Sequence, residues 1–413
     1  MKILTVSYSD SSGGAAKAAY RLHRALVNEG IESWMLVQKK ERDDWCVIGP
    51  DSNLNRFVNI IRPAIEQLPV KWYKNRKPTI FSPSLRGNGI VLKMLKKVRP
   101  DIVHLHWVNG GMIKIEDLTK IDRPIVWTLH DNWVFTGGCH IIYTCQKYKQ
   151  RCGACPVLAS THEYDLSRWV WNRKYKVYNS IKNLTIVTPS RWLTDIAGKS
   201  SLLKNKKKIT IPNGIDTQLF KPIGKSEARK LWNFPSDKKL ILFGAVSATD
   251  DENKGYKELI QALNRLTEKN VELVIFGSSE PQTPLPFKFK TRFLGYLHDD
   301  VSLASLYSAV DVTVVPSLQE AFGQVAAESM SCETPVVAFK TSGLQDIIDD
   351  KQNAYLAEAY DTKDLAYGIK WVLNTPDYDL LCQNAREKIV KEFDSESVAR
   401  KYIALYEEIL NGY

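Results

Sequence analysis

The chain has 413 residues, of which 44% are hydrophobic, 10% aromatic and 25% charged. This length and balance exclude a disordered or fibrous protein and predict two globular domains of about 200 residues each. No window approaches the roughly 18 uninterrupted apolar residues of a membrane span, and Met1–Ser7 lacks the pattern of a signal peptide. We therefore expect a cytoplasmic protein whose membrane association, if any, is peripheral.

The net charge of +11 is partly local. Between Gln67 and Pro100 the sequence has nine Lys or Arg residues and no acidic residue, and Trp72 lies among them. Lys204–Lys208 is a second basic run. Such patches attract lipid headgroups or nucleic acid, and they also occur as ordinary solvated surface. Because aromatic side chains accompany the first patch, we expect an inner-membrane surface as partner and no nucleic acid.

The first half of the chain alternates strands with helix-compatible segments, as a parallel sheet with crossover connections requires. A helix over Ala15–Glu29 follows a glycine-containing turn and ends at Gly30. The expected strands are Ile3–Ser7, Glu32–Gln38, Ile102–Leu105, Ile125–Leu129 and Leu184–Thr188.

The pattern restarts after a polar, Lys-rich link at Ser200–Ile211. We expect a first domain over residues 1–203 and a second over 204–394, with an amphipathic helix at 395–413 packing on the first. The expected second-domain strands are Leu240–Ala245, Val271–Phe276, Arg292–Leu294, Val312–Val315 and Val336–Phe339, and its helices are Tyr256–Glu268, Leu303–Ala309 and Gly323–Ser331.

The most informative stretch runs from Pro316 to Glu328. A buried strand ends at Val315, a loop carries Glu320, and a helix that bears Glu328 begins near Gly323. Free N–H groups at that helix start, together with the helix dipole, form a site for phosphate oxygens. The two carboxylates could then hold different hydroxyl-bearing parts of one ligand. The alternative is a helix start whose acidic residues merely favour its dipole.

The Glu320…Glu328 run, with Phe322-Gly323 inside it, resembles the signature of family 4 of the retaining glycosyltransferases. That family has the GT-B fold, an α/β architecture of two Rossmann-like domains facing across a cleft. The Trp-Thr-Leu-His-Asp-Asn-Trp and Gly-Gly-Cys-His segments further resemble a subgroup from capsule, colanic-acid and exopolysaccharide pathways. Other matching segments follow in the family's order: Gly13-Gly14, Thr128–Asp131, Pro212–Asp216, Lys254-Gly255 and Phe276-Gly277.

The resemblance implies a donor site in the second domain. Glu328 would bind the ribose hydroxyls of a nucleotide, and Glu320 would bind hydroxyls of the transferred sugar. Lys254 would neutralise the diphosphate as charge develops on the leaving group. The backbone would complete this site at Gly277, Ala321, Phe322 and Gly323.

In the first domain, the resemblance implies that Gly13 and Gly14 let a loop approach the phosphates without a Cβ clash. His130 would lie near the anomeric centre. The family usually has a Gly-Arg pair before the lysine, which the segment Gly244–Lys254 lacks. That phosphate contact is either absent or supplied from elsewhere, for example by Arg191 or Ser247.

The implied reaction retains the anomeric configuration. The nucleoside diphosphate leaves, the acceptor hydroxyl attacks from the same face, and the leaving phosphate acts as base. We expect a UDP- or GDP-sugar donor and a lipid-linked or oligosaccharide acceptor in bacterial surface polysaccharide biosynthesis. No catalytic cofactor and no metal at the donor are expected. The alternatives are an epimerase-like enzyme that binds sugar nucleotides and a non-catalytic binding protein of the same fold.

Four of the seven cysteines are close in sequence: Cys139, Cys145, Cys152 and Cys155. Four thiolates at such spacing can hold a structural Zn²⁺, since a reducing cytoplasm disfavours disulfides. The spacing does not match the two-knuckle pattern, so free or redox-active thiols and a disulfide remain open. Cys46, Cys332 and Cys382 are scattered, and we expect them to be packing residues.

His104 and His106 alternate at the end of one expected strand, which places both on one face. The pattern favours a pair hydrogen-bonded in the core over a metal site or a place in the acceptor cleft.

Overall fold

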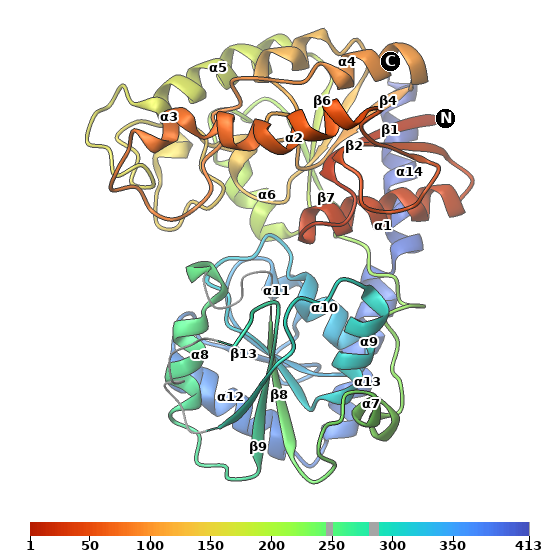
Figure 1. Cartoon of the computed structure of the whole chain (residues 1–413), viewed down its shortest axis with the longest axis vertical. Helices are drawn as coiled ribbons and strands as arrows, with labels where there is room; N and C mark the ends of the chain where they lie inside the picture. Colours follow the sequence, from red (N-terminus) through yellow and green to blue (C-terminus); the bar gives the residue numbers. More distant parts are fainter. Residues whose placement is uncertain (245–250, 281–288, 413) are drawn as a thin grey trace. The chain divides into compact units, whose positions relative to one another are not determined.

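The computed structural model describes residues 1–244, 251–280 and 289–412, and it divides into two compact units. The first unit is Met1–Pro212 with Val398–Tyr413, and the second is Asn213–Ser397. Each unit is a parallel sheet with helices packed on it (Figure 1). The boundary after Pro212 lies later than the one expected after residue 203, because the Lys-rich run forms a strand of the first sheet instead of a linker.

In the described part of the chain the first sheet has seven strands in the order β3-β2-β1-β4-β5-β6-β7. Lysines on β7 are suited to this position, since an edge strand needs charges that discourage pairing with another chain. The strands are β1 (Lys2–Ser9), β2 (Glu32–Lys39), β3 (Val47–Ile48), β4 (Ile102–Leu105), β5 (Ile125–Thr128), β6 (Leu184–Thr188) and β7 (Lys207–Thr210).

The helices of the first unit connect these strands. They are α1 (Gly14–Asn28), α2 (Asn53–Glu66), α3 (Leu68–Lys71), α4 (Ile90–Val98), α5 (Leu166–Ser180) and α6 (Arg191–Gly198), with 3₁₀ turns η1 (Ile115–Lys120), η2 (Trp133–Phe135) and η3 (Lys147–Lys149).

The last helix, α14 (Ser395–Asn411), packs on the first sheet from Val398 onward. Its apolar side chains at i, i+4 and i+7 spacing, Val398, Tyr402 and Leu405, share one core cluster with Ile3 and Val126. Residues of α1 join the same cluster. The helical period of the apolar residues thus explains why this helix covers the sheet.

The second sheet has the order β10-β9-β8-β11-β12-β13 among the described residues. Its strands are β8 (Lys239–Gly244), β9 (Val271–Phe276), β10 (Lys290–Phe293), β11 (Val312–Val315), β12 (Val336–Phe339) and β13 (Tyr355–Ala357). Its helices are α7 (Lys225–Leu231), α8 (Tyr256–Leu263), α9 (Asp300–Ala309), α10 (Gln324–Ser331), α11 (Leu344–Ile347), α12 (Thr362–Asn374) and α13 (Tyr378–Phe393), with the 3₁₀ turn η4 (Glu252–Lys254).

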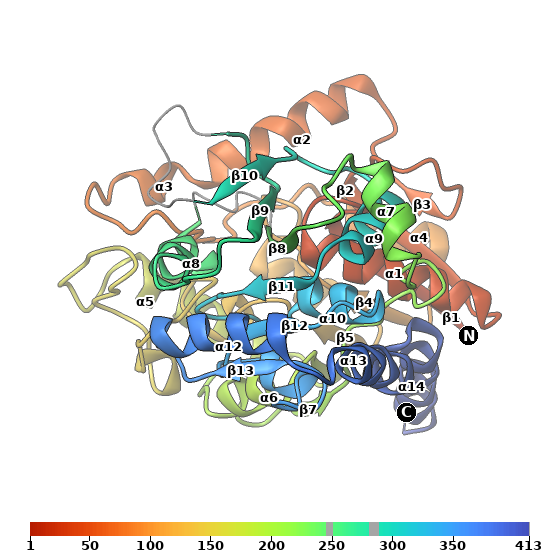
Figure 2. The ribbon, with the colours of Figure 1, turned by 90° about the horizontal axis from the view of Figure 1, so that it is seen from below.

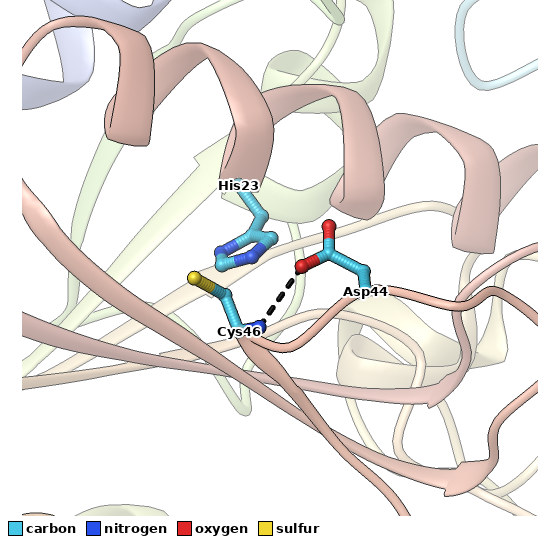
Figure 3. A group of neighbouring side chains, drawn as sticks. All are labelled: His23, Asp44 and Cys46. Carbon is cyan, nitrogen blue, oxygen red and sulfur yellow. Dashed lines mark hydrogen bonds between the residues drawn. The ribbon is translucent and has the colours of Figure 1, made fainter.

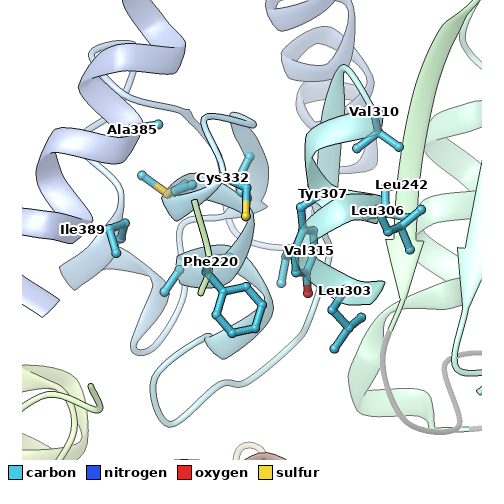
Figure 4. Close-up of a cluster of buried hydrophobic side chains, with 14 of the residues drawn as sticks. Phe220, Leu242, Leu303, Leu306, Tyr307, Val310, Val315, Cys332, Ala385 and Ile389 are labelled. Carbon is cyan, nitrogen blue, oxygen red and sulfur yellow. The ribbon is translucent and has the colours of Figure 1, made fainter. Parts of the chain in front are cut away.

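Alternating side chains of β8 enter two different cores. Leu240 and Leu242 join a cluster with α9, α10 and α13, part of which is drawn in Figure 4. Ile241 and Phe243 join a cluster with α8 and α12. Figure 2 shows helices on both sides of this sheet. A strand buried on both faces reads as a continuous apolar run, and the segment Leu240–Phe243 has that composition.

None of the helices that the structure describes combines the length and the apolar character needed to cross a membrane.

Candidate functional site

Lys254 and Glu320 form an ion pair in the second unit. Lys254 Nζ donates to Glu320 Oε1 over 2.7 Å, and the two side chains are 25% and 20% exposed. Burial disfavours the ammonium form, but the charge and hydrogen bond of Glu320 outweigh it and raise the pKa of Lys254. The lysine is therefore charged at neutral pH and partly accessible to an anionic ligand.

Hydrogen bonds to its backbone hold the segment around Glu320 from two sides. Leu318 N donates to Asn253 O over 2.9 Å, and Asn253 Nδ2 donates to Gln319 O over 2.8 Å. On the other side Glu320 N donates to Ser342 Oγ over 2.8 Å. The turn that carries Lys254 and the loop that carries Glu320 are thus fastened together independently of the ion pair.

Two glycines make this arrangement possible. Gly255 has φ +72°, and a Cβ there would lie 1.9 Å from Pro316 O. Gly323 has φ +116°, and its Cβ would lie 2.7 Å from Leu344 Cδ2. Any other residue would strain the backbone and separate the packed segments, so both glycines are needed for the geometry.

Helix α10 begins after Gly323, the N-cap residue, which provides no side-chain cap. Phe322 is buried, and its ring packs edge-on against Phe393. Ala321 is partly exposed. The N–H groups at this helix start are the ones that the resemblance assigns to the donor.

Glu328 lies on α10 and is 4% exposed. Its Oε2 accepts a hydrogen bond from Tyr307 Oη over 3.1 Å. A buried carboxylate that keeps further acceptor capacity can bind hydroxyl groups. Gly277, with φ +81°, ends β9, and its N–H donates to Gly295 O over 2.7 Å.

The glycine turn of the first unit starts α1. Gly13 has φ +86° and occupies the N-cap, and Gly14 is the first helical residue. A Cβ at either position would meet no atom within 4 Å. No internal packing therefore requires Gly14, which leaves space beside the helix start for a ligand.

His130 lies two residues after the end of β5 and belongs to a chain of histidines. His106 Nδ1 and His130 Nε2 are 2.9 Å apart. Burial lowers the pKa of His130 to about 4, against an opposing effect of Asp131, and burial also lowers the pKa of His106 well below its usual value. Both rings are neutral at pH 7.

The hydrogen-bond pattern indicates the tautomers of this pair. His106 Nε2 is buried, with no hydrogen-bond partner among the described residues. A buried N–H without a partner is more costly than a buried lone pair that already lies among apolar groups, so the proton of His106 belongs on Nδ1. His106 then donates to His130 Nε2, and His130 carries its proton on Nδ1.

His104 is hydrogen-bonded in the core, although not to His106. Its Nδ1 lies 2.7 Å from Tyr406 Oη, and its Nε2 lies 2.8 Å from Thr128 Oγ1. Tyr402 Oη is 2.9 Å from Thr128 Oγ1. The C-terminal helix α14 therefore fixes the position of His104, directly through Tyr406 and through Thr128 by way of Tyr402.

The contacts of a polar cluster around His140 were not predicted from the sequence. His140 Nδ1 lies 2.6 Å from Asp131 Oδ2, which also accepts from Trp107 Nε1 over 2.8 Å. His140 Nε2 lies 2.8 Å from Ser82 Oγ. Asp131, Trp107 and His140 stand in motifs that carry the resemblance, but no spacing rule indicates that they contact one another.

The four clustered cysteines lie in one region of the first unit. Burial, and then the neighbouring Cys155, Cys152 and Cys145, raise the pKa of the Cys139 thiol well above its usual value. Gly137 N donates to Cys152 Sγ over 3.1 Å. However, no three of these sulfur atoms lie within 4.8 Å of one another in the described part of the chain. The structure thus brings the thiols near each other without assembling a tetrahedral site, and zinc there stays a prediction.

Of the two residues considered in place of the missing arginine, Ser247 lies outside the described residues. Arg191 begins α6 in the first unit and is exposed.

Two family models match the chain. One described as Glycosyltransferase Family 4 matches residues 12–219, and one described as Glycosyl transferases group 1 matches residues 224–392. Together they cover both units, and the first alone covers half of the chain.

Similar sequences include an uncharacterised glycosyltransferase of Methanocaldococcus jannaschii, 28% identical over 340 residues that cover 75% of this chain and 83% of the relative. A phosphatidyl-myo-inositol mannosyltransferase of Mycobacterium leprae is 25% identical over 370 residues, covering 87% and 86%. Several D-inositol 3-phosphate glycosyltransferases match over about half of their length or less. These names do not confirm the expected capsule and colanic-acid subgroup.

Solved structures share the fold. Sucrose-phosphate synthase from Thermosynechococcus elongatus has a TM-score of 0.68 at 21% identity, with full coverage of both chains. HepE from Anabaena has a TM-score of 0.64 at 17% identity, again with full coverage of both chains. With both family models matched in chain order over two parallel-sheet domains, the chain belongs to the group 1, family 4 glycosyltransferases of GT-B fold.

Proposed function

We propose that this glycosyltransferase moves a sugar from a UDP- or GDP-sugar to a lipid-linked or oligosaccharide acceptor in bacterial surface polysaccharide biosynthesis, with retention of the anomeric configuration. The observation that carries the donor half is the Lys254–Glu320 ion pair, which places a charged ammonium beside a hydroxyl-binding carboxylate. A nucleotide-sugar fits that combination, because its diphosphate is anionic and its sugar is neutral and carries hydroxyl groups.

Lys254 would stabilise the leaving group. Negative charge accumulates on the β-phosphate as the glycosidic bond breaks, and a fixed ammonium in a partly desolvated site lowers the energy of that state. The N–H groups at the start of α10 would add to this effect. These groups can together perform the charge neutralisation that a divalent ion performs elsewhere, so we propose transfer without a metal at the donor.

Glu328 would bind the nucleotide ribose. The carboxylate is fixed by Tyr307, so it can accept hydrogen bonds from hydroxyl groups without losing side-chain freedom on binding. Glu320, after the diphosphate engages Lys254, would turn its carboxylate to hydroxyls of the transferred sugar.

His130 would position the sugar or the acceptor instead of moving a proton. A neutral ring with its proton on Nδ1 donates one directed hydrogen bond. The leaving phosphate then acts as the base for the acceptor hydroxyl, which attacks from the same face that the phosphate leaves.

Complexes of similar proteins support a nucleotide-sugar donor. HepE has been solved in complex with UDP-glucose. The Mycobacterium leprae relative is named for phosphatidyl-myo-inositol, a lipid, which supports a lipid-linked acceptor. We propose that this chain acts at the cytoplasmic side of the inner membrane, where such an acceptor is reached from the bilayer surface.

An exposed face of the first unit suits that location. Leu54, Phe57 and Ile61 lie at i, i+3 and i+7 on α2 and are 71%, 60% and 38% exposed. Ile60 and Trp72 are 73% and 85% exposed. Exposed cations on and after this segment are Arg56, Lys71, Lys74, Arg76 and Lys77. An exposed apolar helix face with cations nearby in the sequence fits the headgroup region of an anionic bilayer.

A ligand screen tests the donor half. The purified chain is mixed with UDP, GDP, ADP, CMP and their common sugars, and binding is followed by thermal shift and calorimetry, with Glu328→Ala as the comparison. We expect one nucleoside diphosphate to stabilise the wild type selectively and to lose this effect in the variant. Failure of every ligand to bind a folded, monodisperse sample would contradict the proposal.

Transfer is tested with the selected donor and membrane extracts or oligosaccharides as acceptors. NMR of the product then reports the anomeric configuration. Release of the nucleoside diphosphate with an altered free sugar, in the absence of any acceptor, would indicate the epimerase-like alternative.

A further inference from the structure

A buried histidine, aspartate and cysteine meet at the edge of the first sheet, where α1 lies beside β3 (Figure 3). His23 lies on α1, and Asp44 and Cys46 directly precede β3. One ligand atom from each lies within 4.8 Å of the other two. The three residues are 0%, 8% and 3% exposed. None of them takes part in the donor site or the histidine chain.

One atom of this group lacks a partner. His23 Nδ1 lies 2.8 Å from Ser33 Oγ, while His23 Nε2 is buried with no hydrogen bond among the described residues. With its proton on Nδ1 and donated to Ser33 Oγ, the ring keeps a lone pair on Nε2. A buried unpaired polar atom in a folded protein indicates a water or an ion.

The neighbouring contacts orient the other two groups. Asp44 Oδ1 accepts from Cys46 N over 2.9 Å. Asp44 Oδ2 accepts from Tyr20 Oη over 3.0 Å and from Arg24 Nη1 over 3.3 Å. Metal ligands are fixed by a second layer of hydrogen bonds of this kind, with the histidine held through its other nitrogen.

We propose that His23, Asp44 and Cys46 bind a zinc ion. Nitrogen, carboxylate oxygen and thiolate sulfur are all ligands of Zn²⁺, and a water would complete the tetrahedron. Binding displaces the proton of the Cys46 thiol, because the thiolate is the ligand. The thiolate and the carboxylate then balance the charge of the ion. Arg24, whose side chain is 40% exposed, would turn from Asp44 into solvent.

The ion would stabilise the glycine turn at the start of α1. Glu41 precedes Asp44 on the same loop, and its Oε2 accepts hydrogen bonds from the hydroxyls of Ser9, Ser11 and Ser12. These serines lead into Gly13, where α1 starts. Zinc between α1 and the loop would therefore hold the turn in a fixed conformation. The site itself does not depend on the donor proposal.

Metal analysis of the full chain tests the site. The protein is produced with zinc supplied, freed of loosely bound metal, and assayed for zinc per chain. We expect Cys46→Ser and His23→Gln each to lose one equivalent. Cys332→Ser changes a buried cysteine of the second unit and should retain this equivalent of zinc. Cys152→Ser should also retain the zinc bound by His23, Asp44 and Cys46.

Wild-type protein alone provides a second measurement if the variants fold poorly. X-ray absorption at the zinc edge should show mixed nitrogen, oxygen and sulfur ligands. Cobalt substitution should give a thiolate charge-transfer band with the intensity of a single thiolate. Zinc retained by both Cys46→Ser and His23→Gln, zinc lost only in Cys152→Ser, sulfur-only coordination, or no zinc after reconstitution would each overturn the proposal. The nucleotide screen is repeated with the metal-depleted chain. Because it measures donor binding without zinc, its outcome tests the donor proposal separately from the zinc site.

Discussion

Lys254 and Glu320 are 66 residues apart in the chain, yet Lys254 Nζ and Glu320 Oε1 lie 2.7 Å apart. The ion pair holds each side chain in a fixed position. An arriving diphosphate could bind the same ammonium, because lysine has three N–H donors and the hydrogen bond to Glu320 uses one of them.

Replacing this lysine should abolish most of the transfer activity. We expect Lys254→Ala to lower kcat/KM about 10²- to 10³-fold, the usual effect of removing one electrostatic stabiliser of developing charge. The fold should survive, because the backbone and side-chain hydrogen bonds of Asn253 hold the same loops together. Lys257→Ala is the matched control, since Lys257 is exposed and pairs with Glu252 over 3.0 Å. Equal activity of the two variants would contradict the assignment.

Glu328 should control donor affinity more than turnover. Because hydrogen bonds to a charged group contribute about 1.5–3 kcal/mol, Glu328→Ala should raise the donor KM by about 10- to 100-fold. Tyr307→Phe keeps the carboxylate and removes the hydroxyl that donates to its Oε2. Tyr307→Phe should therefore lower stability with a much smaller change in KM. Steady-state kinetics with varied donor distinguish the two effects.

The sequence predicted the two parallel sheets because their strands are continuous apolar runs between helical segments. It also predicted which loops carry Gly13, Lys254 and Glu320, through order and residue type. The boundary between the compact units lies after Pro212 and not after residue 203, because Lys-rich β7 resembles a linker unless its pairing with β6 is seen. An edge strand has few apolar residues to mark it.

Contacts between distant segments could not be predicted. His104 bonds to Tyr406 across 302 residues, and His140 meets Ser82 across 58. Such pairs depend on how the elements pack. Residue type and local spacing in the sequence do not indicate which distant segments come into contact. The cysteine cluster is a different case. Its sequence spacing suggested a metal, and in the described part of the chain no three of its sulfur atoms lie within 4.8 Å of one another, so zinc there stays a prediction.

Gly14 and Gly13 should respond differently to alanine. A Cβ at Gly14 meets no atom within 4 Å and its backbone is helical, so Gly14→Ala should leave stability unchanged. If phosphate packs there, the donor KM should rise about tenfold, equivalent to ~1.4 kcal/mol. Gly13→Ala should also lower stability by about 1–2 kcal/mol, because φ is +86°. Unchanged kinetics in Gly14→Ala would place the phosphate elsewhere.

Buried histidines should make the first unit sensitive to mild acid. Burial lowers the pKa of His130 to about 4 and that of His104 to about 3, from 6.5. Below pH 6.5 the unfolded chain binds protons that the folded chain does not. The free energy of unfolding should therefore fall as pH falls, by about 1.4 kcal/mol per pH unit for each group.

Denaturant titrations between pH 7.5 and about pH 5 measure how the free energy of unfolding changes with pH. Near pH 7.5 these histidines should contribute no slope. His104→Gln should reduce the slope, although its lost hydrogen bonds lower stability at every pH. His162→Gln is the control, since His162 is exposed. An unchanged slope in His104→Gln would show that other groups dominate acid unfolding.

The exposed face of α2 should bind anionic membranes. Phe57→Glu replaces a 60% exposed ring by a charge, so it should weaken co-sedimentation with phosphatidylglycerol vesicles about tenfold or more, since burial of an aromatic side chain contributes about 1.5–3 kcal/mol. The fold should be retained because the side chain contributes little to the core. Val301→Glu is the matched control, a 66% exposed apolar residue on α9 of the second unit.

Changing the salt concentration and the lipid composition measures how much the cations contribute to vesicle binding. Binding that requires the cations should weaken as ionic strength rises and disappear with neutral phosphatidylcholine vesicles. Activity on a soluble acceptor should stay unchanged in Phe57→Glu, while activity on a membrane-borne acceptor should fall. Equal vesicle binding by Phe57→Glu and Val301→Glu would mean that α2 does not face the bilayer.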